Sequence, residues 1–339
     1  MPELDLAALV RDYGDPFAEA RACREHCALF DFSFVARASV RGPNALAFLS
    51  RLTRRSMAGL RPGQIRYAVR TDANGVLISD LTVWKHDQDS YEVMSGRQAD
   101  LDDLASPTDA ETVVENLTAE TAIFAVQGPG TLAALYGLTD TERLAGLAYF
   151  SHIRSRIADV PCLIGRLGYT GEAGVEIILS QRNAREVWQV LAERARPAGF
   201  AAADILRIEA GFVLFTNEFR LPVRPAEAGL ARFAGTADAE SEIRLVCFKA
   251  HTSERPILWR PRSAPRRPLQ PGTLVATSAC WSPLARRPLG LGYARSIDLQ
   301  DGAALSDPEN QFQSISVTSL PFYDPEKRRP RKNWPKTGI

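Results

Sequence analysis

The sequence predicts an α+β protein in which two related subdomains precede an all-β domain. Three observations support this fold class. Helix and strand patterns alternate over the first two thirds of the chain, one strand–Gly-Pro–helix pattern occurs twice, and after Ile243 short strands separated by proline and glycine replace the helices. These changes divide the chain into a two-subdomain region (1–235), a β-domain (241–325) and a basic tail (326–339), with a boundary near 231–241.

The elements of the first subdomain follow from capping residues and from alternation. Asp15 and Pro16 predict the start of a helix that continues to about Leu29. Residues 34–40 alternate like a strand, and the Ala-Asn-Gly turn at 73–75 predicts a hairpin. The other expected elements are, in order, a helix over 44–54, strands over 65–71, 76–84 and 91–95, and a helix over 98–104.

The repeated pattern lies in two stretches of similar sequence. Val40–Leu49 and Val126–Leu135 each read strand, Gly-Pro, helix, with leucine and alanine at matching positions. Such self-similarity predicts two related α+β subdomains built from the same split unit. An amphipathic helix is expected over 182–194, and the short strands after Ile243 predict a small β-barrel or jelly-roll domain.

Composition limits the class of protein. The 339 residues are 45% hydrophobic and 24% charged, as in an ordinary soluble globular protein, and contain neither an apolar run of ~18 residues nor a signal-peptide pattern. Five scattered cysteines predict reduced thiols and a cytoplasmic location without membrane association. Cys23, His26 and Cys27 lie close together without a second ligand pair, so a packed helix face is favoured over a metal site.

Basic residues crowd the end of the chain between Lys327 and Lys336, although the net charge of the whole is only +1. A basic tail can contact nucleic acid or an acidic protein, but a solvated, partly disordered end is the favoured interpretation. The rest of the chain has no basic stripe, so no nucleic-acid partner is expected.

Two acidic residues interrupt strands that are otherwise apolar. Glu176 lies between Val175 and Ile177 after a glycine-rich turn, and Asp80 lies in the strand over 76–84. A buried carboxylate costs desolvation free energy unless a partner binds it, and a ligand edge with two parallel N–H donors would bind it well. The pattern predicts one polar pocket; a structural carboxylate at Glu176 and a strand-edge pair at Asp80 are the alternatives.

Short motifs occur in a fixed order over nearly the whole chain. They are Leu29–Ser33, Pro62–Gln64, Val126–Pro129, Gly168–Glu172, Leu206–Gly211, Pro225–Leu230, Thr277–Ser278 with Ser282–Pro283, and Leu320–Tyr323. Together they resemble the aminomethyltransferase family: the T-protein of the glycine cleavage system, the folate domains of dimethylglycine and sarcosine oxidising enzymes, and folate-dependent demethylases. The resemblance implies a T-protein-like cloverleaf, in which two ferredoxin-like subdomains and a C-terminal β-barrel or jelly-roll domain surround a tetrahydrofolate site.

The resemblance also implies roles for particular residues. Glu176 matches the glutamate that holds the pterin ring, and Asp80 matches the catalytic aspartate beside the folate N5/N10 edge. Tyr67 and Tyr169 match aromatic positions that line the pterin pocket, although tyrosines commonly just fill core and interface space. Arg286 can meet the folate glutamate tail, with a solvated surface position as the alternative.

The implied activity is tetrahydrofolate-dependent one-carbon transfer of the aminomethyltransferase type. A small-molecule aminomethyl or methylated donor would supply the carbon, and a lipoyl carrier protein or an oxidoreductase subunit is the implied partner. Asp80 would stabilise positive charge at the transferred carbon, Glu176 would position the pterin, and no metal is needed. The alternatives are a folate-binding protein without transferase activity, whose typical Lys-Gly-Cys motif is absent here, and an inactive subunit of an amine-demethylating oxidase complex.

Several stretches depart from the family pattern. The family's segment before the first helix is mostly absent, residues 230–245 lack an Ile-Gly-Arg-Glu stretch, and residues 33–35 lack a common histidine. Ala201–Ala203 replaces Gly-Ala-Arg, and Thr216–Glu218 stands where relatives have Gly-Asn and an acid. We expect intact folate binding, an altered opening on the donor side, and poor turnover with a standard lipoylated carrier.

Overall fold

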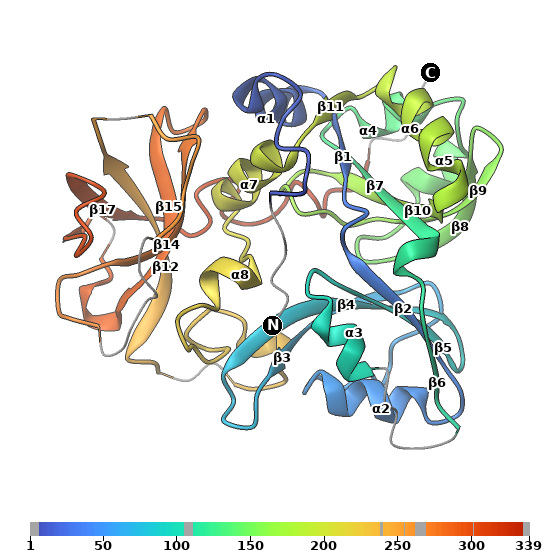
Figure 1. Ribbon diagram of the computed structural model, residues 1–339, viewed down its shortest axis with the longest axis horizontal. Coiled ribbons are helices and arrows are strands. Elements are labelled where there is room, and N and C mark those ends of the chain that lie inside the picture. The colour runs from blue at the N-terminus through green and yellow to red at the C-terminus, as the bar shows by residue number, and fades with distance from the viewer. Residues whose placement is uncertain are drawn as a thin grey trace.

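Three β-sheets form three lobes around a centre that is crossed by α7 (Phe200–Glu209) and α8 (Phe215–Glu218) (Figure 1). The computed structural model describes residues 7–104, 111–237, 240–253, 255–261, 269–300 and 302–334. All but the first residue of α7 are buried, and the helix packs between α1 (Pro16–Glu25) and the C-terminal sheet. A helix with no exposed face is expected at the centre of a large protein, where apolar surface surrounds it on all sides.

The first subdomain is a five-stranded antiparallel sheet with the strand order β3-β4-β5-β2-β6. Its elements are β2 (Ala36–Arg41), α2 (Ala45–Leu52), β3 (Ile65–Thr71), β4 (Leu77–Asp87), β5 (Ser90–Ser95), α3 (Ala99–Leu104) and β6 (Val113–Asn116). Leu81 and Val83 of β4 face a core that includes residues of α2 and α3. The opposite face carries Val69, Trp84 and Met94 into the central core of the molecule.

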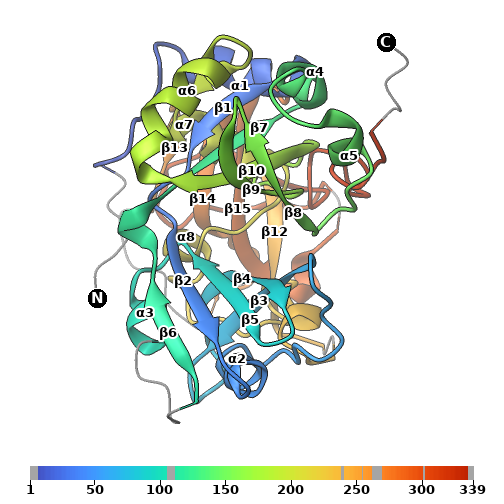
Figure 2. The same ribbon diagram turned by 90° about the vertical axis from the view of Figure 1, so that its right-hand side faces the viewer.

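The second subdomain is a six-stranded sheet with the strand order β11-β1-β7-β10-β9-β8. Its elements are β1 (Ala28–Asp31), η1 (Thr118–Glu120), β7 (Thr121–Gln127), α4 (Thr131–Leu135), α5 (Thr141–Ala145), β8 (His152–Ile157), β9 (Val160–Gly165), β10 (Gly174–Ser180), η2 (Gln181–Asn183), α6 (Ala184–Ala192) and β11 (Arg196–Ala198). Figure 2 shows this subdomain above the first.

The predicted internal repeat is confirmed by the topology. The order β3-β4-β5-β2 in the first sheet matches β8-β9-β10-β7 in the second, and both repeats begin at the strand that precedes the Gly-Pro turn. In the first sheet, β6 pairs with the outer side of β2. In the second sheet, the equivalent place beside β7 is taken by β1, which precedes the whole first subdomain in sequence. The two subdomains are therefore intertwined, because an early strand completes the later sheet.

The predicted extent of the first helix is wrong at its C-terminal end. Asp15 caps it as expected, since its side chain accepts hydrogen bonds from the backbone N–H groups of Phe17 and Ala18. The helix ends at Glu25, and β1 begins at Ala28. Two ladders explain the early end, because β1 pairs with both β7 and β11 and its backbone hydrogen bonds override local helix propensity.

The early end of α1 also changes the setting of the Cys-His-Cys cluster. Cys23 is a buried residue of the helix, and its thiol donates a hydrogen bond to the backbone carbonyl of Gln127. His26 and Cys27 lie beyond the helix, so the three do not share one helix face. The described part of the chain holds no group of three or more His, Cys, Asp or Glu side chains placed to bind a metal.

The C-terminal domain is a single sheet with the strand order β13-β14-β15-β12-β17-β16. Its elements are β12 (Ile243–His251), β13 (Leu258–Trp259), β14 (Val275–Ser282), β15 (Arg287–Arg295), η4 (Ser296–Asp298), β16 (Ala304–Leu305) and β17 (Ser314–Thr318). A bridge between Thr273 and Ser306 shows that the sheet curls. A closed barrel is not confirmed, since the described strands include no pairing between β13 and β16.

The basic tail is anchored as far as Trp334, while Arg328, Arg329, Arg331 and Lys332 are exposed to solvent. Lys336 lies outside the described residues. The Trp334 ring is buried in the core of the second subdomain and lies 4.5 Å from the Arg166 guanidinium. Arg166 also donates a hydrogen bond to the backbone carbonyl of Lys332. A second anchor lies at Tyr323, whose hydroxyl donates to Glu172.

No helix in the described part of the chain is long and apolar enough to cross a membrane.

The contact between Trp84 and Gly165 gives a test of how the two subdomains pack. A Cβ atom at Gly165 would overlap the Trp84 indole, so we expect Gly165→Ala to lower the free energy of unfolding by about 1–3 kcal/mol. In a Trp84→Leu background, where the indole is gone, the same substitution should cost less, because only the Leu167 side chain, 2.8 Å from the new Cβ, still has to shift. Chemical denaturation of the double-mutant cycle measures the difference. Gly146→Ala is the control, because Gly146 has a negative φ and a Cβ atom there would make only ordinary van der Waals contacts, at 3.7 Å or more. Equal costs in both backgrounds would contradict this packing.

Candidate functional site

Asp80 projects from the face of β4 that is turned toward the second subdomain. Asp80, Thr82 and Trp84 alternate along the strand and share this face, as the hydrogen bond from the Trp84 indole to the Thr82 hydroxyl confirms. The Tyr67 hydroxyl, from the neighbouring β3, donates a hydrogen bond of 3.0 Å to Asp80 Oδ2. Burial raises the pKa of Asp80 to about 6, although the Tyr67 hydrogen bond acts in the opposite direction.

Tyr169 belongs to the same group of side chains. It lies in the turn between β9 and β10, where its hydroxyl donates a hydrogen bond of 2.6 Å to the backbone carbonyl of Val213. Its ring stacks on Phe212 at a centroid distance of 6.1 Å. Burial raises the pKa of Tyr169, and the Asp80 charge adds to the rise, so the two side chains lie within electrostatic reach of each other.

Glu176 lies on the facing sheet, in the middle of β10. It is paired in register with Ala125 of β7 and with Gly165 of β9, two residues that leave space around its side chain. Among the described residues its carboxylate has no hydrogen-bond or ion-pair partner, so the alternative of a carboxylate satisfied within the protein is not supported. Burial raises its pKa to about 7.

Trp84 connects the two acidic positions. Its indole packs on Gly165, directly opposite Glu176, while its own strand carries Asp80 four residues earlier on the same face. The two carboxylates therefore belong to facing sheets that meet at this contact. Tyr149 is a further neighbour, because the Glu176 charge contributes to the rise of its pKa to about 12, which burial dominates.

Arg286 is not brought to this group. It lies in the turn between β14 and β15 with a φ of 53°, and its side chain is exposed. No side-chain partner for it is found among the described residues. The structure thus groups Tyr67, Asp80 and Tyr169 and places Glu176 on the facing sheet. The roles of all five residues stay predictions.

Three aromatic residues of this region were missed by the sequence analysis. Phe233 packs edge-on against Tyr67 at 4.8 Å, Phe212 stacks on Tyr169, and Tyr149 lies near Glu176. Phe212 follows directly on the Leu206–Gly211 motif, which could have drawn attention to it. Nothing in the local sequence marks Tyr149 or Phe233, because their place depends on how distant segments meet.

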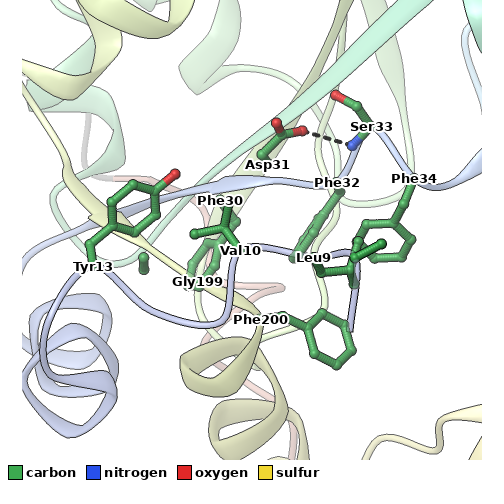
Figure 3. A pocket seen from close by; sticks show the side chains of 12 residues that line it. Leu9, Val10, Tyr13, Phe30, Asp31, Phe32, Ser33, Phe34, Gly199 and Phe200 are labelled. Atoms are coloured by element: carbon green, nitrogen blue, oxygen red, sulfur yellow. Dashed lines mark hydrogen bonds between the residues drawn. The ribbon is translucent and has the colours of Figure 1, made fainter. Parts of the chain in front are cut away.

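A separate hollow of about 160 Å³ lies between the N-terminal segment, β1 and the start of α7 (Figure 3). Its labelled lining is mostly apolar, with Leu9, Phe32 and Phe200 among the residues drawn. Asp31 lies in it, but this carboxylate accepts a hydrogen bond from the Ser33 backbone N–H. None of the five predicted site residues lines the hollow, and it lacks a second acid, so the facing sheets are the better candidate site.

Comparison with known proteins identifies the family and the fold of the chain. Residues 15–237 match the model of the GCVT N-terminal domain. The chain is 32% identical to an aminomethyltransferase of Streptomyces avermitilis, over 93% of this chain and 91% of that one, and 31% identical to a probable aminomethyltransferase of Halobacterium salinarum, over 92% of each. The crystal structure of glycine cleavage system aminomethyltransferase T from Bartonella henselae superposes with a TM-score of 0.76 at 25% identity, covering 96% of this chain and 93% of that one.

The predicted fold class and family are therefore confirmed, apart from the barrel. The chain belongs to the aminomethyltransferase family, a family of transferases, because its sequence matches that family over most of its length and its architecture matches that of a solved member.

Proposed function

We propose that the protein transfers a one-carbon unit to tetrahydrofolate, in the manner of an aminomethyltransferase. The observation that carries the proposal is the pair of carboxylates with raised pKa values, Asp80 and Glu176, on the facing sheets of a chain of this family. Perturbed carboxylates that lack full protein partners are typical of sites completed by a ligand. When bound, tetrahydrofolate supplies the nucleophilic N5 amine.

Glu176 binds and orients the pterin in this proposal. Its carboxylate has no partner among the described residues and offers two oxygens to a planar edge with parallel N–H donors. Such a bidentate contact compensates the desolvation of the carboxylate and fixes the rotation of the ring. Tyr67 and Tyr169 flank the site from the side of Asp80, where their rings give apolar surface for the ligand.

Asp80 acts near the reacting atoms. The Tyr67 hydroxyl fixes the orientation of its carboxylate, and a pKa of about 6 leaves it mostly ionised near neutral pH. An ionised carboxylate in a partly desolvated site stabilises positive charge that develops on a transferred carbon. Its raised pKa also suits it to accept and return a proton near neutral pH.

The carbon donor is a small aminomethyl or methylated compound, delivered either directly, by a lipoyl carrier protein or by an oxidoreductase subunit. The aminomethyltransferase names of the relatives favour an aminomethyl group. The alternative of a non-catalytic accessory subunit has no observation in its favour, since Asp80 is present and held by Tyr67. The five free cysteines fit a reducing compartment, and we propose the cytoplasm.

Substitution of Glu176 tests the binding role. We expect Glu176→Ala to weaken tetrahydrofolate binding by about 1–3 kcal/mol, because two ligand donors lose their acceptor. Calorimetric titration under anaerobic conditions measures this difference. Glu115→Ala, at an exposed position on β6, is the matched control and should bind like the wild type. Equal affinity of Glu176→Ala and wild type would remove Glu176 from the site, and no binding by the wild type would overturn the proposed function.

The pH dependence of binding follows from the raised pKa of Glu176. Its ionised form accepts the ligand N–H groups, but burial favours the protonated form in the free protein below about pH 7. Affinity should therefore rise about tenfold from about pH 6 to about pH 8 and then level off. The neutral variant Glu176→Gln should show a much flatter profile in the same titrations, and parallel profiles of the two proteins would refute this role.

Substitution of Asp80 separates chemistry from binding. Asp80→Asn keeps the shape but removes the charge, so folate affinity should stay within a few fold while one-carbon transfer falls by roughly 10² or more. The assay follows formation of methylene- or methyl-tetrahydrofolate, with an aminomethyl-loaded lipoyl protein and with a small amine donor in parallel. Transfer at the wild-type rate with the donor that supports turnover would show that Asp80 is only structural.

A further inference from the structure

The face of the second sheet that carries Glu176 has a row of residues paired in register. Gly165 of β9 is paired with Glu176 of β10 on one side and with His152 of β8 on the other. Residues that are directly opposite each other on neighbouring strands point to the same face of a sheet. A side chain at Gly165 would therefore lie between those of Glu176 and His152, and the glycine leaves this place open.

The Trp84 indole, from β4 of the first subdomain, fills the open place. A Cβ atom at Gly165 would overlap Cη2 and Cζ3 of Trp84, so the outer ring of the indole lies over the glycine. The centres of the Trp84 and His152 rings are 5.3 Å apart. Directly opposite side chains have Cβ atoms about 4.5–5.5 Å apart, so the indole is also within reach of the Glu176 side chain.

His152 holds Trp84 in this position. The His152 Nε2–H donates a hydrogen bond of 2.9 Å to the backbone carbonyl of Lys85, the residue after Trp84, and a carbonyl can only accept. Burial, followed by the neighbouring His86, lowers the pKa of His152 to about 4, whereas the pKa of Glu176 is raised to about 7. The imidazole is therefore neutral over the range in which Glu176 titrates.

Burial alone accounts for the raised pKa of Glu176. Several ionisable side chains reach this region from the surrounding elements, but their charges do not produce the rise. They are Tyr67, Asp80 and His86 from the first sheet, Tyr149, His152, Arg166 and Tyr169 from the second subdomain, and Arg331 from the tail. The state of Glu176 thus depends on what covers its carboxylate rather than on a charged neighbour.

Glu176 is covered on one side. Its side chain keeps part of its surface exposed, whereas Trp84 has no exposed surface. The indole lies on the Gly165 side of the carboxylate, so water is excluded from that flank. The exposed part leaves another flank for a ligand.

We propose that Trp84 is a positioning residue for Glu176: the indole, held by His152, excludes water from one flank of the carboxylate and directs its oxygens to the open flank. This inference rests on the proposed function and extends the site to two residues that do not touch the reacting atoms. A carboxylate restricted to one direction suits a bidentate contact with a planar edge of N–H donors.

Two variants and a matched control test the proposal. Trp84→Leu removes the ring, and His152→Ala keeps the ring but removes its support. Trp188→Leu is the control, because Trp188 packs on Phe124 at the opposite face of the same sheet. Nuclear magnetic resonance of isotope-labelled glutamate carboxyl groups, assigned with Glu176→Gln, follows the titration of Glu176 in the free protein. The Kd of tetrahydrofolate is measured over the same pH range.

The wild-type carboxyl group of Glu176 should titrate near pH 7. In Trp84→Leu and His152→Ala water reaches the covered flank, so the midpoint should fall by about one pH unit or more, toward the ordinary value of about 4.3. The rise in folate affinity from about pH 6 to about pH 8 should then shrink from about tenfold to about twofold. Affinity at the upper pH should be several fold weaker, because the carboxylate is no longer held in one direction. Trp188→Leu should keep the wild-type profile.

An unchanged Glu176 midpoint in both variants would show that Trp84 only packs the two subdomains together, and would overturn the inference. An equal shift in Trp188→Leu would overturn it as well, since the cause would then be a general loosening of the sheet. If Trp84→Leu does not fold, His152→Ala decides the question. Failure of the wild type to bind folate would overturn the proposed function, while the titration of the free protein still decides whether Trp84 covers Glu176.

Discussion

The arrangement of the lobes depends on one buried guanidinium, that of Arg207. It lies on α7 with no exposed surface and pairs with Asp204 at 2.6 Å and with Glu218 of α8 at 2.7 Å. It also donates a hydrogen bond to the Ser278 hydroxyl of β14. A buried charge of this kind is tolerated only when its partners are in place, and loss of one partner typically costs several kcal/mol.

The network around Arg207 reaches the candidate site. Glu218 accepts hydrogen bonds from Thr277 and Ser278 of β14, so it ties α8 to the C-terminal sheet. In turn, α8 packs against β4, the strand that carries Asp80, and the Glu218 charge contributes to the raised pKa of Asp80. Asp80, which we place at the reacting atoms, is thus oriented by Tyr67 of its own sheet, and its pKa is influenced by Glu218 of α8.

The internal repeat, the start of the first helix and the two candidate acids could be predicted, because each of them has a signal in a short stretch of sequence. The Gly-Pro repeat marks equivalent turns, Asp15 marks a cap, and acids at 80 and 176 stand out within apolar strands. The two acids lie on facing sheets because alternation fixes the face of each side chain, and the repeat makes the two sheets equivalent.

The parts that could not be predicted depend on contacts between distant segments. The first helix stops at Glu25 because β1 completes a sheet whose other strands lie between residues 121 and 198. The tail is fixed because Trp334 packs in the core of the second subdomain and contacts Arg166. The composition of the tail alone does not indicate these contacts. Arg286 lies on an exposed turn, and its local motif predicts the turn but not which part of the molecule the side chain approaches.

The central claim is that the facing sheets form the folate site, and a crystal structure of the protein with tetrahydrofolate tests it most directly. The account predicts the pterin between the two subdomains, with the Glu176 carboxylate on its N–H edge and Asp80 beside N5. A folate bound instead in the hollow beside Phe200, or at the exposed turn of Arg286, would contradict it.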